Sequence, residues 1–303
     1  MRLLLTFQKT AVAALPVAIA LAVLVPGAMA QQPSWASVET ALGRKGAMQP
    51  GNVIKFSFPR SDLSVSVAGV TLKPALALGG WVAFKEAGGG QVMAMGDLVL
   101  TEDEVSPVMA ALQAGGVEQT ALHNHLLKEL SHVMYVHILA HGDPTKIART
   151  IHDALGQSKT PLGAASPPAA PSAADLDTAG IARALGIAGK LNGVVYQVSV
   201  SRQETITDSG MEVPPSMGVA TAINFQPTGG GKAAITGDFV LRASEVNPVI
   251  RALRENGIEV TALHSHMLTE DPRLFFMHFW ANDDAVKLAR GLKAALSQTA
   301  SRF

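Results

Sequence analysis

Histidines recur at two places in the chain with the same spacing, a His-x-His pair followed by a third histidine twelve residues later. The two sets are His123, His125 and His137, and His264, His266 and His278. Residues two apart on a β-strand point to one face, with Cα atoms about 6.5–7 Å apart. If the polar turn 128–131 joins two antiparallel strands, we expect the third histidine opposite the first or the second, about 5 Å away. Imidazoles at this separation suit metal–nitrogen bonds of about 2.0–2.1 Å, so the spacing predicts one divalent metal site in each half of the chain.

Zinc is the metal that all-imidazole ligation favours first, although copper, nickel, iron and manganese are also compatible. Three ligands leave a fourth position open, which is typical of catalytic sites and allows the ion to activate water or polarise a carbonyl group. Glu129 and Glu270 follow the two His-x-His pairs. We predict them as catalytic general bases, with a fourth metal ligand or a hydrogen-bond partner of an imidazole as alternatives. The competing interpretation is that all six histidines are neutral core residues.

The other polar candidates are interpreted as structural. His132, His141 and His152 have no histidine counterpart in the second half, which indicates surface residues. The remaining pairs are expected to form turns, helix caps and ion pairs, with contact to a ligand as the alternative for the carboxylates and binding of a substrate anion for the arginines; they are Asp97 and Asp238, Glu104 and Glu245, and Arg60 and Arg202.

The histidine sets belong to a longer internal repeat. Thr120-Ala121-Leu122-His123 recurs as Thr261-Ala262-Leu263-His264, and the match continues without a gap from Pro74/Pro215 to Leu155/Leu296. Repetition at a fixed offset indicates a duplicated structural element. We predict a first repeat unit at 34–156, a Pro/Ala-rich linker at 157–174 and a second unit at 175–298.

The periodicity of apolar residues and the positions of turn-forming residues predict the helices and strands of one unit. We expect a short helix near 35–42 and extended segments at 53–58, 63–67, 81–85 and 92–100, with a hairpin turn at the Gly88-Gly89-Gly90 run. A helix should follow, capped by Ser106 with Pro107 at its first position. Strands at 117–127 and 132–140 and a helix opening at Asp143-Pro144 complete the unit. The fold class is therefore α+β, with two tandem, mostly antiparallel sheets that carry helices and form a pseudo-dimer.

The first thirty residues are typical of a signal peptide. Arg2 and Lys9 precede the apolar run 11–25, and Ala28-Met29-Ala30 offers a small-x-small cleavage site. We expect cleavage after Ala30, a periplasmic or secreted location, and no membrane anchor afterwards. A retained anchor is the alternative.

Composition excludes several functions. Lys and Arg total 24, equal to Asp and Glu, so no net charge attracts nucleic acid or an anionic membrane. The chain has no cysteine, which excludes disulfides, thiolate ligands and a lipid-modified cysteine.

The segments Thr-Ala-Leu-His-Asn-His-Leu-Leu and Thr-Ala-Leu-His-Ser-His-Met-Leu, with 272–280 after the second, resemble the LppY/LpqO family of exported bacterial proteins. The resemblance covers essentially the whole mature chain, but the lipid-attachment cysteine of those lipoproteins is missing. The histidine spacing is also remotely similar to α-acetolactate decarboxylase, to the plant-and-prokaryote-conserved domain and to a related vertebrate ester hydrolase. This similarity implies that all six histidines are zinc ligands.

Three functions fit these observations. One is a zinc-dependent hydrolase or lyase acting on a small carbonyl or ester substrate, with Glu129 and Glu270 moving protons. The second is a non-catalytic periplasmic metal- or ligand-binding module. The third is a cell-envelope structural or interaction protein, which would hold no metal. The substrate, the metal and the oligomeric state are not determined by the sequence.

Overall fold

The computed structural model describes residues 35–163, here called the first half, and 175–303, the second half. The predicted signal peptide and most of the predicted linker lie outside the described residues. Within the described ranges, no helix is long and apolar enough to cross a membrane.

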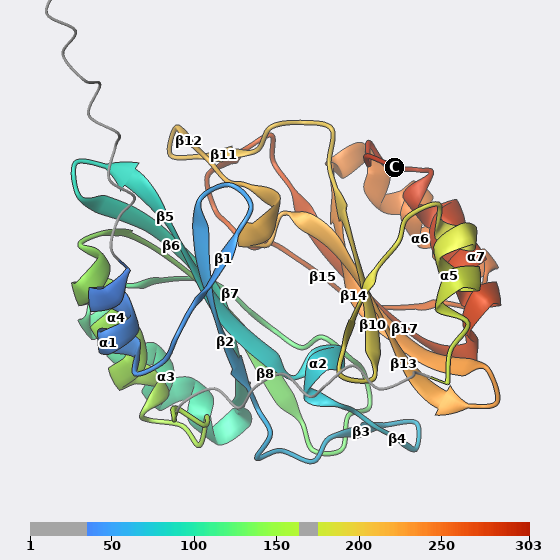
Figure 1. Ribbon diagram of the computed structural model, residues 1–303, viewed down its shortest axis with the longest axis horizontal. Coiled ribbons are helices and arrows are strands. Elements are labelled where there is room, and N and C mark those ends of the chain that lie inside the picture. The colour runs from blue at the N-terminus through green and yellow to red at the C-terminus, as the bar shows by residue number, and fades with distance from the viewer. Residues whose placement is uncertain (1–34, 164–174) are drawn as a thin grey trace, which may run out of the picture. The chain divides into compact units, whose positions relative to one another are not determined.

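Each half is built on a six-stranded antiparallel sheet (Figure 1). In the first half the order is β1 (Ala47–Gln49), β2 (Val53–Pro59), β5 (Gly79–Gly88), β6 (Gln91–Thr101), β8 (Val133–Gly142) and β7 (Glu118–His123). In the second half it is β9 (Lys190–Asn192), β10 (Val195–Ser201), β13 (Ala220–Gly229), β14 (Lys232–Leu241), β17 (Phe275–Asp284) and β15 (Glu259–His264). The order therefore repeats, which confirms the duplicated α+β architecture.

Short strands and helices complete each half. The strands are β3 (Ser66–Val67), β4 (Val70–Thr71), β11 (Thr207–Asp208), β12 (Met211–Glu212) and β16 (Glu270–Asp271). The helices of the first half are α1 (Ala36–Leu42), α2 (Pro74–Ala77), α3 (Glu102–Ala114) and α4 (Pro144–Leu155). Those of the second half are α5 (Thr178–Leu185), the 3-10 helix η1 (Pro215–Met217), α6 (Ala243–Glu255) and α7 (Ala285–Leu296).

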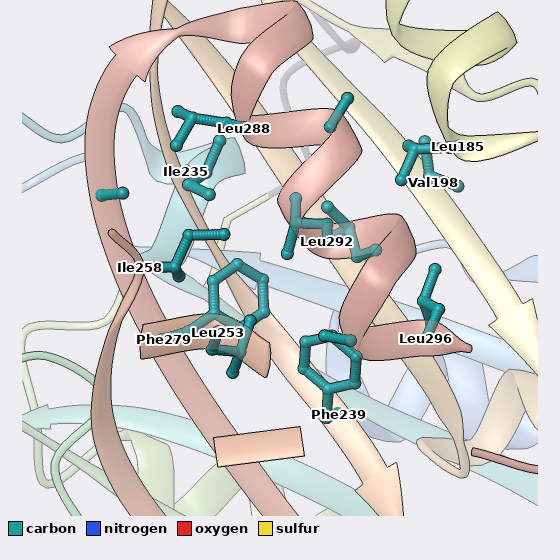
Figure 2. Close-up of a cluster of buried hydrophobic side chains, with 14 of the residues drawn as sticks. Leu185, Val198, Ile235, Phe239, Leu253, Ile258, Phe279, Leu288, Leu292 and Leu296 are labelled. Carbon is teal, nitrogen blue, oxygen red and sulfur yellow. The ribbon is translucent and has the colours of Figure 1, made fainter. Parts of the chain in front are cut away.

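Each sheet buries one face under its own helices. In the second half, Phe279 of β17 packs with Leu253 of α6 and with Leu288 and Leu292 of α7 (Figure 2). In the first half, α1, α3 and α4 cover the equivalent face with residues such as Leu42, Leu112 and Ile151. Burying a side chain of this size stabilises the fold by about 1.5–3 kcal/mol.

The opposite faces of the two sheets pack against each other. Met95 and Leu139 of the first half share a buried cluster with Phe276 and Met217 of the second half. Tyr135 shares another cluster with Trp280. The expected pseudo-dimer is thus present within one chain.

Several local predictions are confirmed. The glycines of the Gly88-Gly89-Gly90 turn have φ angles of 89°, 60° and 77°, a region that favours glycine. Asp143 caps α4 by accepting a hydrogen bond from the Lys146 amide at 2.7 Å. Gly115 follows the last residue of α3.

Three predicted boundaries are wrong. Helix α3 begins at Glu102, so Pro107 lies inside it and not at its first position. The reason is that Thr101 and Glu104 form a capping box one turn earlier. The extended segment 63–67 contains only the two-residue strand β3. Strand β7 ends at His123, so His125 lies in the following loop and not on the strand.

Candidate metal centre

The third histidine of each set lies on the strand next to an edge strand of its sheet. His137 of β8 pairs with Asp97 of β6 on one side and with Ala121 of β7 on the other. His123 pairs with Tyr135, so the expected pairing of His137 with His123 or His125 is wrong. The connection is not a tight turn, because Leu130 extends to form a bridge with Ser66. In the second half, His278 is placed in the same way, between Asp238 and Ala262.

The six histidines form one cluster between the sheets. The closest ring pairs join the two halves: the centroids are 3.7 Å apart for His123 and His264, 3.8 Å for His125 and His278, and 3.9 Å for His137 and His266. Within the first half, His123 lies 5.1 Å from both His125 and His137. The expectation of a separate three-histidine site in each half therefore has to be replaced by a shared arrangement.

Three sets of ligand atoms lie close enough to hold an ion, with all atoms of a set within 4.8 Å of one another. We call them the His125 group (His123, His125, His278), the Asp238 group (Asp238, His264, His266) and the central group (His123, His137, His264). The first two share no residue, so they can be filled together. The central group competes with both, because it uses His123 and His264.

The nitrogen atoms that face the cluster lack partners. The Nε2 atoms of all six histidines are buried and accept or donate no hydrogen bond among the described residues. Several of the rings are oriented through their other nitrogen: Nδ1 lies 2.7 Å from the Gly237 carbonyl in His278, 3.1 Å from that of Gly218 in His266 and 3.0 Å from that of Asn124 in His123. A carbonyl only accepts, so these Nδ1 atoms carry the proton and Nε2 keeps its lone pair, as in metal-bound histidines.

One close approach has the spacing of two ligands on one cation. His266 Nε2 lies 2.9 Å from Asp238 Oδ2, although the pair does not satisfy hydrogen-bond geometry at Nε2. With the proton on Nδ1, both facing atoms are electron-rich. Such atoms come this close when a cation lies between them, since ligands at about 2.0–2.2 Å from one ion are about 3 Å apart. The residues present therefore fit a bound divalent ion.

Burial favours the neutral form of three of the imidazoles. It lowers the pKa of His123 to about 3, helped by the neighbouring His278, and lowers the pKa values of His125 and His137 well below the ordinary value. A neutral imidazole is the form that binds metal. Burial, reinforced by the charge of Asp238, also raises the pKa of Asp97 well above its usual range.

Asp97 and Asp238 were not predicted as site residues. Asp97 Oδ2 lies 3.6 Å from His125 Nε2, and Asp97 Oδ1 lies 4.0 Å from His137 Nε2. The recurrence of Gly-Asp in both halves was the available signal. It could not be interpreted without knowing that β6 lies beside β8 and β14 beside β17.

The threonine of the repeated Thr-Ala-Leu-His motif joins the halves. Thr120 donates to the His266 carbonyl at 2.6 Å, and Thr261 donates to the His125 carbonyl at 2.5 Å. Each half thus holds the loop histidine of the other. Sequence reasoning missed this role because the bond connects residues more than 130 positions apart.

Glu129 and Glu270 lie outside the three ligand groups. Glu129 is buried and accepts from the Val133 amide at 3.3 Å, whereas Glu270 accepts from the Leu274 amide at 2.9 Å and pairs with Arg273 at 3.2 Å. These contacts hold the loop that carries the second histidine. The catalytic role predicted for both glutamates stays a prediction.

The remaining candidates are structural, as expected. Arg60 forms a buried ion pair with Glu104 at 2.7 Å, and Arg202 forms the same pair with Glu245 at 2.7 Å. His132 and His141 are exposed.

Comparison with known proteins identifies the domain that is repeated. A family model described as Domain of Unknown Function (DUF1259) matches residues 36–157 and again 179–298. None of the curated proteins matches.

Two solved structures show weak similarity. The chain is 14% identical to a trimeric bacterial microcompartment shell protein, PduB, with a TM-score of 0.20, and 11% identical to EtuB from Clostridium kluyveri, with a TM-score of 0.18. Each alignment covers 83% of this chain and 90% of the other. These values are too low to support a conclusion about fold or function. The two family matches, in contrast, together span most of the chain. The chain therefore belongs to the family Domain of Unknown Function (DUF1259) and carries two tandem copies of its domain.

Proposed function

We propose that this chain is an exported protein that binds divalent transition metal ions, zinc first among them, in the cluster formed by both halves. The observation that carries the proposal is the convergence of six buried Nε2 atoms that have no hydrogen-bond partner among the described residues. Leaving a buried polar atom unpaired costs about 1–3 kcal/mol, so histidines that served only for packing would be expected to have partners. We also propose cleavage after Ala30, a periplasmic or secreted location, and kinship with the LppY/LpqO proteins.

Metal binding without turnover is the leading form of this proposal, because three of the rings are nearly inaccessible. His137, His266 and His278 are 3%, 5% and 3% exposed. A second candidate is a zinc-dependent hydrolase or lyase acting on a small carbonyl or ester substrate. It is favoured by the His125 group, whose three neutral ligands leave room for an additional one. When bound there, zinc supplies Lewis-acid activation, and Glu129 and Glu270 are the proposed proton carriers.

Metal analysis of untagged protein, purified from the periplasm and reloaded with zinc, tests the proposal. We expect up to two zinc ions per chain, filling the His125 and Asp238 groups. His123→Ala and His264→Ala should each remove about one ion. His141→Ala is the matched control, since His141 is exposed and lies outside the cluster, and it should change nothing. A folded wild-type protein that takes up no divalent metal would refute the proposal.

A further inference from the structure

The two loop histidines are equivalent in the repeat but differ in their support. Tyr135 stacks on His125 with ring centroids 3.2 Å apart, and Phe276 stacks on His266 at 3.5 Å. The Tyr135 hydroxyl donates to the Ala77 carbonyl at 2.8 Å. The equivalent carbonyl in the second half belongs to Gly218, and it accepts from His266 Nδ1 instead.

This exchange of donors affects how firmly each ring is held. His266 Nδ1 is fixed by the Gly218 carbonyl because Phe276 has no hydroxyl to compete for it. His125 Nδ1 has no such partner among the described residues, since Tyr135 occupies the Ala77 carbonyl. A histidine whose second nitrogen is hydrogen-bonded is held in the tautomer and orientation that a metal requires.

Asp238 and Asp97 differ in the same direction, in how closely each carboxylate approaches its loop histidine. Asp238 approaches His266 Nε2 to 2.9 Å and belongs to a ligand group. Asp97 stays 3.6 Å from His125 Nε2 and belongs to none. The Asp238 group therefore offers two imidazoles and a carboxylate at ligand spacing, and the His125 group offers three neutral imidazoles.

From these differences we propose that the two ligand groups of the centre have separate roles. The Asp238 group holds a tightly bound ion, and the His125 group holds an exchangeable ion whose open position binds a small oxyanion such as a carboxylate or a phosphate. This inference rests on the proposed metal-binding function.

The charge balance explains why the added ligand is an anion. A divalent ion bound by three neutral imidazoles keeps its full double charge inside the protein. A carboxylate in the Asp238 group offsets half of that charge. In the His125 group the nearest carboxylate, Asp97, lies 3.6 Å from His125 Nε2 and is not a member of the ligand group. Uncompensated charge is costly in a buried site, so an external anion is favoured where no carboxylate belongs to the ligand group.

Cobalt substitution tests the proposal, because cobalt reports its ligands by visible absorption. We expect wild-type protein to bind two cobalt ions per chain, and a chelator to remove one at least about tenfold faster than the other. Loss of an outer-shell partner alone costs about 10–100-fold in metal affinity, and loss of a ligand such as Asp238 should cost at least as much. Asp238→Asn should therefore release the slower ion at least about tenfold faster. The matched variant Asp97→Asn should change either rate by no more than about threefold.

Acetate and inorganic phosphate are the probes for the open position. Either should shift the cobalt spectrum of wild-type and Asp238→Asn protein with saturation, and neither should shift that of His125→Gln. The pair His125→Gln and His266→Gln repeats the comparison if an aspartate variant fails to fold, as judged by circular dichroism.

The possible failures are distinguishable. Wild-type protein that binds no cobalt would refute the proposed function itself. Two ions that leave at the same rate, or equal effects of Asp97→Asn and Asp238→Asn, would overturn the division of roles between the His125 group and the Asp238 group. A spectrum that neither anion changes would overturn the oxyanion site.

Discussion

The two halves of the molecule share a backbone and a set of histidines, but they differ in the residues behind those histidines. Both halves hold a short segment of the other: Lys55 donates to the Ser216 carbonyl at 3.4 Å, and at the equivalent place Gln197 donates to the Ala75 carbonyl at 2.9 Å. Glu270 has Arg273 as an ion-pair partner, whereas Glu129 Oε1 is buried with no partner among the described residues. The comparison shows that the duplicated scaffold was kept while the surroundings of the ligands diverged.

The largest expected effect tests whether the two scaffolds are equivalent. Arg60→Met leaves the buried Glu104 without its ion-pair partner, and Arg202→Met does the same to Glu245, whose side chain is 12% exposed. Removing one member of a buried ion pair destabilises a protein by about 3–5 kcal/mol. We expect both variants to lose free energy of unfolding in this range in urea denaturation of the full chain. A loss confined to one of them would show that the scaffolds are not equivalent.

A smaller expected effect is the pH dependence of folding stability that Glu129 causes. Burial raises the pKa of Glu129 to about 7 from an ordinary value of 4.5. Because the unfolded state then loses its proton first, the folded state loses stability as the pH rises from about 4.5 to about 7, and above that the loss is constant. Over this window the loss reaches about 3 kcal/mol, at 1.36 kcal/mol for each pKa unit.

Glu129→Gln should remove this pH dependence. We expect the variant to match the wild type near pH 4 and to exceed it by up to about 3 kcal/mol at pH 8, as measured from urea midpoints. Glu270→Gln is the matched control. It removes the carboxylate charge that pairs with Arg273, so it should lower the stability and give no gain at pH 8. A Glu129→Gln variant that is less stable than wild type at pH 8 would contradict the prediction.

The smallest effect concerns the aromatic rings that stack on the loop histidines. Tyr135→Phe removes the bond to the Ala77 carbonyl, at a cost of about 0.5–1.5 kcal/mol in stability. It also frees that carbonyl for His125, so metal should leave the His125 group a few-fold more slowly. The converse change, Phe276→Tyr, introduces a competitor for the Gly218 carbonyl and should speed metal loss from the Asp238 group. Chelator-exchange rates of both variants check this, and unchanged rates in both would refute it.

Much of the fold follows from short-range signals. The Gly88-Gly89-Gly90 turn and the Asp143 cap were predictable because they depend on the backbone preferences of a few adjacent residues. The start of α3 was misplaced, since Ser106-Pro107 competes as a signal with Thr101 and Glu104. The histidines of the candidate centre were also predictable, because their spacing is repeated.

The sequence by itself determined that the chain is a tandem repeat of one α+β domain and that six histidines are its candidate ligands. Only the tertiary structure decided how these ligands combine, with His125 facing His278 and His137 facing His266 across the joint between the halves. It also decided that Asp238 joins them. The physical reason is that hydrophobic burial brings the two sheets face to face, and the hydrophobic effect is not directional. It places side chains from distant strands within a few ångströms of one another, and no local sequence pattern specifies which of them meet.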